Sequence, residues 1–169
     1  MRTIVSEGAK VMANPDDYQA RASIMWAGTL AHNDLCGVGR VQDWASHGIE
    51  HELSALYDCA HGAGLAVVMP AWMTYVHKSD TARFARFARN VFGVGLGVSD
   101  EDAALAGIAA FRAWLKSLGL PLTFAELGAK EEDIPLLVKT LNLNGNTLGG
   151  IMPLNEADVE AIYRSMGDS

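Results

Sequence analysis

DWASHGIEHELSALYDCAHGAG, residues 43–64, is the stretch that sets the local fold around three of the five histidines in the chain. These histidines are His47, His51 and His61. Asp43 is a favourable N-cap for a helix that carries the first two. The run 57–60 predicts a break, after which His61 and the glycines that follow it open the next segment. Because imidazole binds metals and exchanges protons near neutral pH, the stretch is also the candidate site.

The spacing of the histidines limits how they can share a metal ion. His47 and His51 are four residues apart, so on one helix they lie on the same face, about 6 Å apart along the axis. His61 follows His47 by 14 residues, which on an unbroken helix is about 21 Å. Metal–nitrogen bonds are about 2.0–2.1 Å long, so His61 can join either of the others only across the break. The same spacing also fits solvated or hydrogen-bonded histidines that bind no metal.

The rest of the chain has helical periodicity and helix caps, with no alternating strand of useful length. We therefore predict an all-α, bundle-like domain of about eight helical segments. They are residues 1–13, Asp17 to about Gly37, 43–57, 65–77, Ser79 to Phe92, Ser99 to Gly119, Glu131 to Leu141 and Asn155 to Met166, with a further capping box at Thr123–Glu126. The first segment has no cap before it, which is typical of a fragment or of a frayed N-terminal helix.

Composition excludes several classes of partner. The net charge of −7 disfavours a nucleic-acid groove or an anionic membrane surface. Only two cysteines occur and neither lies in a CxxC pair, so a disulfide scaffold is disfavoured and reduced cytoplasmic thiols are expected. The longest apolar run, 65–73, contains Pro70 and falls short of the roughly 20 residues that cross a bilayer. We expect a cytoplasmic protein with neither a nucleic-acid nor a membrane partner.

A short motif offers one functional alternative. Residues 47–51 fit H-x-x-E-H, the pattern of a zinc peptidase in which the two histidines bind zinc and Glu50 is the general base. A third ligand would come from a downstream carboxylate. The candidates are Glu126, Glu131 and Glu132. Gly48 argues against this interpretation, because glycine weakens the middle of a zinc-binding helix.

A longer string is more specific than this pentapeptide. DWASHGIEHELSALYDCAHGAGLAVVMPAWM, residues 43–73, resembles the histidine-rich segment of iron-containing (group III) alcohol dehydrogenases of the butanol dehydrogenase branch. The likeness extends upstream through NPDDYQARASIMWAGTLAHNDLCGVG, residues 14–39, and downstream through IPLLVKTL, residues 134–141. It therefore covers nearly the whole chain.

The resemblance implies a fold and an activity. Residues 1–169 correspond to the helical C-terminal domain of the dehydroquinate synthase-like, iron-containing alcohol dehydrogenase fold, and the N-terminal NAD(P)-binding α/β domain is absent. The implied reaction is NAD(P)-linked interconversion of small alcohols and aldehydes. The implied full-length enzyme is a homo-oligomer, a dimer, and the isolated chain is expected to be inactive. Gly93–Gly97 lies between predicted helices, so it is expected to be a loop rather than a dinucleotide fingerprint.

The resemblance also implies roles for individual residues. His47 and His61 would bind a divalent metal, Fe2+ or Zn2+, together with an Asp and a His from the upstream domain. His51 would lie beside the nicotinamide and the substrate, where it would contact the cofactor and shuttle the alcohol proton. Glu50 and Glu52 would be solvent-facing or structural.

Overall fold

A computed structural model describes residues 1–167, and over that range the chain is helical without a regular strand. The predicted all-α class is therefore confirmed. An isolated antiparallel bridge joins Leu148 and Leu154. The elements are α1 (Arg2–Ala13), α2 (Tyr18–His32), α3 (Ala45–Tyr57), α4 (His61–Val76), the 3-10 helix η1 (His77–Asp80), α5 (Thr81–Phe92), α6 (Asp100–Ser117), α7 (Phe124–Leu127), the 3-10 helix η2 (Glu131–Asp133), α8 (Ile134–Thr140) and α9 (Glu156–Arg164).

Side-chain caps begin several helices where the sequence predicts them. Asp17 accepts from the Ala20 amide at the start of α2, and Asp80 accepts from the Arg83 amide at the start of α5. The predicted end of α2 near Gly37 is wrong, because α2 stops at His32. Asp34 has a left-handed backbone with φ 58°, which an α-helix cannot contain.

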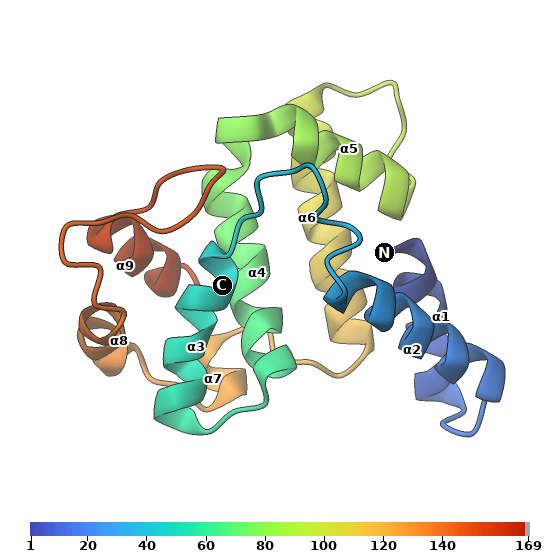
Figure 1. Ribbon diagram of the computed structural model, residues 1–169, viewed down its shortest axis with the longest axis horizontal. Coiled ribbons are helices and arrows are strands. Elements are labelled where there is room, and N and C mark those ends of the chain that lie inside the picture. The colour runs from blue at the N-terminus through green and yellow to red at the C-terminus, as the bar shows by residue number, and fades with distance from the viewer. Residues whose placement is uncertain (168–169) are drawn as a thin grey trace.

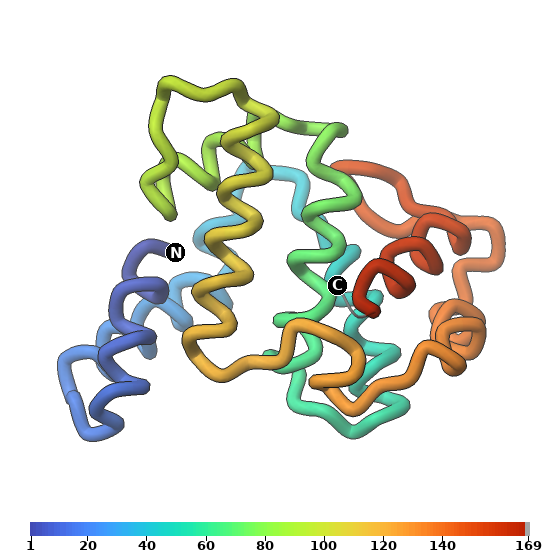
Figure 2. Tube along the Cα trace, turned by 180° about the vertical axis from the view of Figure 1, so that it is seen from behind, coloured from blue at the N-terminus to red at the C-terminus, as the bar shows by residue number. Residues whose placement is uncertain are grey.

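Helix α4 runs through the middle of the molecule, with α3 on one side and α6 on the other (Figure 1). It contacts α9 as well, and its buried residues occur all around its circumference. Figure 2 shows the opposite side, where α6 and α4 lie side by side and the loop after α6 leads to α7. A helix that is apolar on every face is stable only when it is covered on every face. Helix α4 is therefore the centre of the core.

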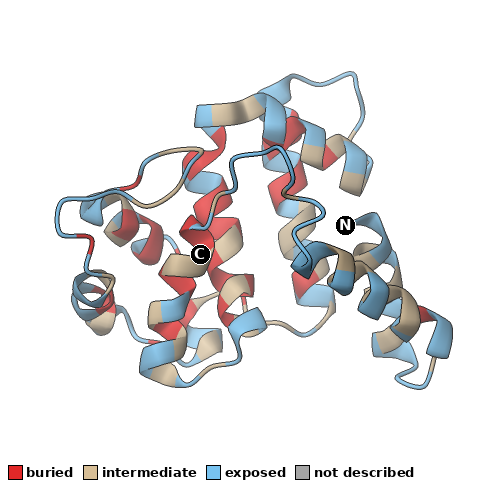
Figure 3. Cartoon of the chain, in the orientation of Figure 1, coloured by how far each residue is buried: buried red, intermediate tan, exposed pale blue. Residues whose placement is uncertain are grey.

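The pair α1 and α2 is much less buried than the rest. Figure 3 shows buried residues concentrated in α3, α4, α6 and α9, whereas α1 and α2 are largely exposed. Helix α2 leaves Met25 74% and Trp26 64% exposed. The indole N–H of Trp114 on α6 donates to the Val5 carbonyl at 3.1 Å and ties this pair to the body of the domain. Among the residues that the structure describes, no helix is long and apolar enough to span a membrane.

Tyr163 connects the histidine-bearing helix to the C-terminal helix. Its side chain is fully buried, and its hydroxyl donates to the Ile49 carbonyl at 2.6 Å. Burial raises the pKa of Tyr163, so the phenol stays protonated and remains a donor. This bond fixes α9 against the segment of α3 that lies between His47 and His51.

We expect Tyr163→Phe to lower the free energy of unfolding by about 1–2 kcal/mol, because the buried hydrogen bond is lost without replacement by water. Urea unfolding measures the change. Tyr75→Phe is the matched control, since its hydroxyl donates to Asp158 at 2.7 Å on the exposed surface, where water replaces the bond. Equal losses of unfolding free energy in the two variants would show that the buried hydrogen bond stabilises the chain no more than the exposed one.

Candidate metal centre

The predicted break between the two helices is present. Helix α3 ends at Tyr57, and Asp58 has a left-handed backbone with φ 50° that reverses the chain. Ala60 is extended, and His61 is the first residue of α4. The Tyr57 hydroxyl donates to Asp133 at 2.5 Å and accepts from the Lys130 amide at 3.1 Å, which anchors the end of α3. The turn therefore returns the chain so that the start of α4 lies against α3.

The three histidines of the sequence stretch meet at this junction. The ring centroids of His47 and His61 are 5.4 Å apart, those of His51 and His61 are also 5.4 Å apart, and those of His47 and His51 are 6.4 Å apart. Ligand atoms of Glu50, His51 and His61 all lie within 4.8 Å of one another, and His47 is not a member of that set. The geometry thus brings all three imidazoles together, and either α3 histidine can accompany His61.

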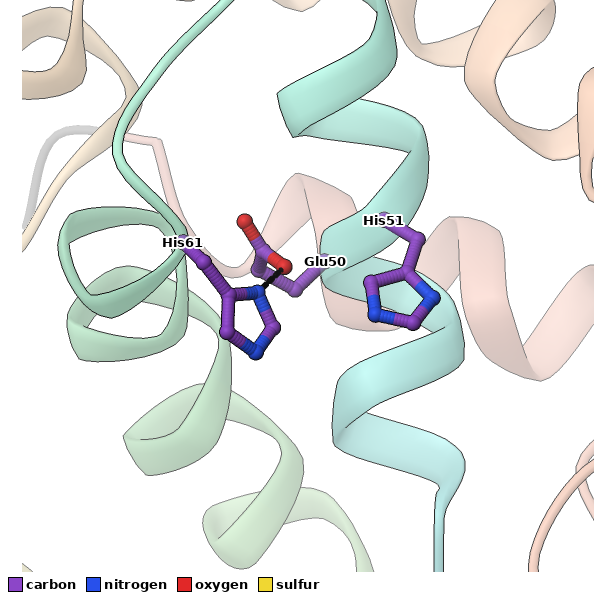
Figure 4. A group of neighbouring side chains, drawn as sticks. All are labelled: Glu50, His51 and His61. Carbon is purple, nitrogen blue, oxygen red and sulfur yellow. Dashed lines mark hydrogen bonds and ion pairs between the residues drawn. The ribbon is translucent and has the colours of Figure 1, made fainter.

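Glu50 lies beneath the histidines and is fully buried. One carboxylate oxygen contacts Nδ1 of His61 (Figure 4). The other accepts from the Ser54 hydroxyl. A carboxylate only accepts, so Nδ1 of His61 is the donor in this contact, and in the neutral imidazole Nε2 is then the acceptor. Of the two predicted roles for this glutamate, the solvent-facing one is wrong, because the close packing of α4 on α3 covers the side chain.

His47 has two features expected of a metal ligand, a ring nitrogen without a hydrogen-bond partner in the described chain and a lowered pKa. Its Nδ1 is buried and has no hydrogen-bond partner among the residues that the structure describes. Trp44 packs edge-on against the ring, with centroids 5.0 Å apart. Burial lowers the pKa of His47, and the charges of His61 and His51 lower it further, against the opposite effect of Glu50. The imidazole is therefore kept in the neutral form that metals bind.

Asp43 does not cap α3 directly. The helix begins at Ala45 with Trp44 as its N-cap, one residue later than predicted. One oxygen of Asp43 accepts from the Ala45 amide at 2.8 Å. The other accepts from the amides of Gly150 and Ile151, both at 2.8 Å. The carboxylate therefore clamps a distant loop onto the start of the histidine helix.

The peptidase alternative lacks a suitable base. Both oxygens of Glu50 are engaged, by His61 and by Ser54, and the side chain is closed to solvent. Within residues 1–167, the proposed third ligands do not join the histidine set, and Glu126 instead accepts from the Leu122 amide at 2.6 Å. A general base must reach the water that it activates, and this glutamate does not.

The site opens to the surface on one side. His51 is exposed, and the side chain of His61 is 48% exposed. Glu50 closes the opposite, inner side. The described part of the chain thus forms one wall of a site, with imidazoles on its surface and a carboxylate behind them.

A helical domain with three histidines clustered at a helix junction is a candidate metal-binding domain, and comparison with known proteins gives its family. Residues 1–167 match the family described as "Fe-containing alcohol dehydrogenase family, C-terminal". The chain belongs to this family, as the resemblance implies.

Relatives and solved structures agree with this assignment. NADH-dependent butanol dehydrogenase A of Clostridium acetobutylicum is 38% identical over 166 residues, which are 97% of this chain and 43% of that protein. NADPH-dependent aldehyde reductase YqhD of Escherichia coli is 37% identical over 145 residues, or 86% of this chain and 37% of that protein. The crystal structure of NADH-dependent butanol dehydrogenase A from Thermotoga maritima superposes with a TM-score of 0.93 at 44% identity, covering 99% of this chain and 44% of that chain. The chain spans less than half the length of these relatives, and the predicted C-terminal-domain fold is confirmed.

Proposed function

We propose that this chain is the metal-ligating C-terminal domain of an NAD(P)-linked alcohol dehydrogenase that interconverts small alcohols and aldehydes. The observation that carries the proposal is the convergence of His47, His51 and His61 at the α3–α4 junction in a chain of this family. The activities named for the relatives, butanol dehydrogenase and aldehyde reductase, support the substrate class. The nicotinamide-binding domain would form the other wall of the site.

The donor set fits a divalent metal. Imidazole suits both iron and zinc. Nε2 of His61 is left free by the bond between Nδ1 and Glu50, and the buried Nδ1 of His47 has no partner in the described chain. We assign His47 and His61 as the ligands of this domain on the family resemblance alone, since the ring centroids of both α3 histidines are 5.4 Å from that of His61 and the close set of ligand atoms contains His51 rather than His47. The remaining ligands would come from the NAD(P)-binding domain.

The residues of this chain then divide the chemistry among them. When bound, a divalent metal supplies Lewis-acid polarisation of the substrate oxygen, and the nicotinamide supplies or accepts the hydride. His47 and His61 would hold the metal ion. His51, which is exposed at the surface, would contact the nicotinamide and pass the alcohol proton to or from water, a role suited to imidazole near neutral pH.

A domain exchange tests the proposal. Residues 1–169 would replace the matching C-terminal part of the Thermotoga maritima butanol dehydrogenase, to which they are 44% identical. We expect the metal-loaded chimera to oxidise NADH in the presence of butanal, and residues 1–169 expressed alone, without a nicotinamide-binding domain, to show no turnover.

The control is the same chimera carrying His61→Ala, which should fold but not reduce butanal. A chimera that folds, binds NADH and retains metal, yet reduces no aldehyde, would refute the proposed function.

A further inference from the structure

We propose that Glu50 is a positioning residue that fixes the ring orientation and the tautomer of His61 for metal binding. This inference rests on the proposed function, because it assigns Glu50 a role through a metal ligand. The histidine-rich motif contains the glutamate, but the spacing of the histidines gives it no role in dehydrogenation.

The contact joins the two helices at the site itself. Glu50 lies on α3, immediately before His51, and His61 is the first residue of α4 (Figure 4). The glutamate side chain is 0% exposed, and its described partners are His61 Nδ1 and the Ser54 hydroxyl. A buried carboxylate is costly unless it is paired, so this geometry is maintained only if the imidazole stays in place.

The chemistry of the pair favours ligation through Nε2. A carboxylate that accepts the Nδ1 proton of an imidazole fixes the tautomer, orients the ring and raises the basicity of the opposite nitrogen. Replacement of such a partner typically weakens metal binding by about 10–100-fold. Glu50 meets the structural requirement, because it accepts from His61 on the inner side of the ring while the outer side is open.

Gly64 provides an independent sign that α4 is built around this carboxylate. A Cβ at this position would lie 2.2 Å from Oε1 of Glu50, 2.8 Å from its Cγ and 2.9 Å from its Cδ. Glycine is less favourable than alanine inside a helix. The absent side chain at Gly64 makes the space that Glu50 occupies behind His61.

Glu50→Gln is the most direct variant because it removes the charge and preserves the shape. The glutamine oxygen can accept from His61 Nδ1, and its amide can donate to Ser54, whose hydroxyl lies 3.3 Å from the Cys59 carbonyl and can donate there instead. The matched control is Glu52→Gln, which removes the same charge two residues away. Urea unfolding establishes that each variant is folded.

Two measurements on the 169-residue chain test the inference. In a Co2+ titration followed by visible absorption, we expect Glu50→Gln to weaken binding about 10-fold or more, and Glu52→Gln to change it by less than about twofold. In 15N NMR of the metal-free chain, we expect His61 to be the Nδ1–H tautomer in the wild type and a mixture of tautomers in Glu50→Ala.

The outcomes separate this inference from the proposed function. If Glu50→Gln binds Co2+ as tightly as the wild type, or if wild-type His61 is the Nε2–H tautomer, the positioning role is wrong while the dehydrogenase assignment stands. If the wild-type chain binds no Co2+, its two assigned ligands do not hold the ion without those of the NAD(P)-binding domain, and the tautomer of His61 decides whether Glu50 orients the ring.

Discussion

His61→Ala is expected to abolish metal binding and to lower kcat for butanal reduction in the chimera by about 10³-fold or more, because Lewis-acid polarisation contributes several kcal/mol to such a reaction. The alanine also leaves Glu50 buried without its imidazole partner. Elemental analysis measures the loss of metal, and steady-state kinetics measures the loss of kcat.

Comparison of the two α3 histidines decides which of them is the ligand. We expect His47→Ala to lose the metal as His61→Ala does. We expect His51→Ala to retain it and to lose about 10²–10⁴-fold in rate, the usual contribution of a general acid–base group. The reverse pattern, with metal lost from His51→Ala and kept by His47→Ala, would show that the pair His51–His61 holds the ion and that the family resemblance misassigns His47.

Gly107→Ala is expected to lower the free energy of unfolding by about 2 kcal/mol, through overpacking of a helix pair. Gly107 lies on α6, where a Cβ would be 2.3 Å from the Cβ and 2.8 Å from the Cα of Ala88 on α5. The backbone of Ala88 cannot move aside as a flexible side chain can, so α5 and α6 must move apart. The gain in helix propensity, about 1 kcal/mol, offsets only part of this cost.

Urea unfolding of Gly107→Ala and Gly28→Ala makes the comparison quantitative. Gly28 lies inside α2, and a Cβ there would meet nothing within 4 Å. Alanine at this position should therefore stabilise the chain by up to about 1 kcal/mol. Stabilisation by both variants would mean that α5 and α6 have more freedom to separate than their contact indicates.

Much of the fold could be predicted because its signals are local. Asp17, Asp80 and Ser99 each accept from the amide three residues later, as their positions before apolar periodic segments predict. The capping box at Thr123 is only half formed, because Glu126 accepts from the Leu122 amide rather than from that of Thr123. Gly128, with φ 83°, then ends α7 after a single turn.

The candidate site was only partly predictable, for a physical reason. The helix break that brings His61 to His47 and His51 is determined by residues adjacent in the sequence, so the sequence predicts it. The burial of Glu50 depends on the space at Gly64 and on the packing of α4 against α3, which are tertiary properties. The choice between His47 and His51 as ligand is not set by spacing or by ring distances.

The central position of α4 has a consequence for the motions of the site. Segments of a protein open at different free energies, and the least buried open first. In this chain we expect α1 and α2 to exchange amide protons with solvent before the middle of α4 does, since residues 64–73 of α4 are all buried or half-buried. His61 begins α4, so we expect the contacts among the three histidines to persist through local opening of the exposed pair. The least buried helices, α1 and α2, are thus separate from α3 and α4, which carry the proposed ligands.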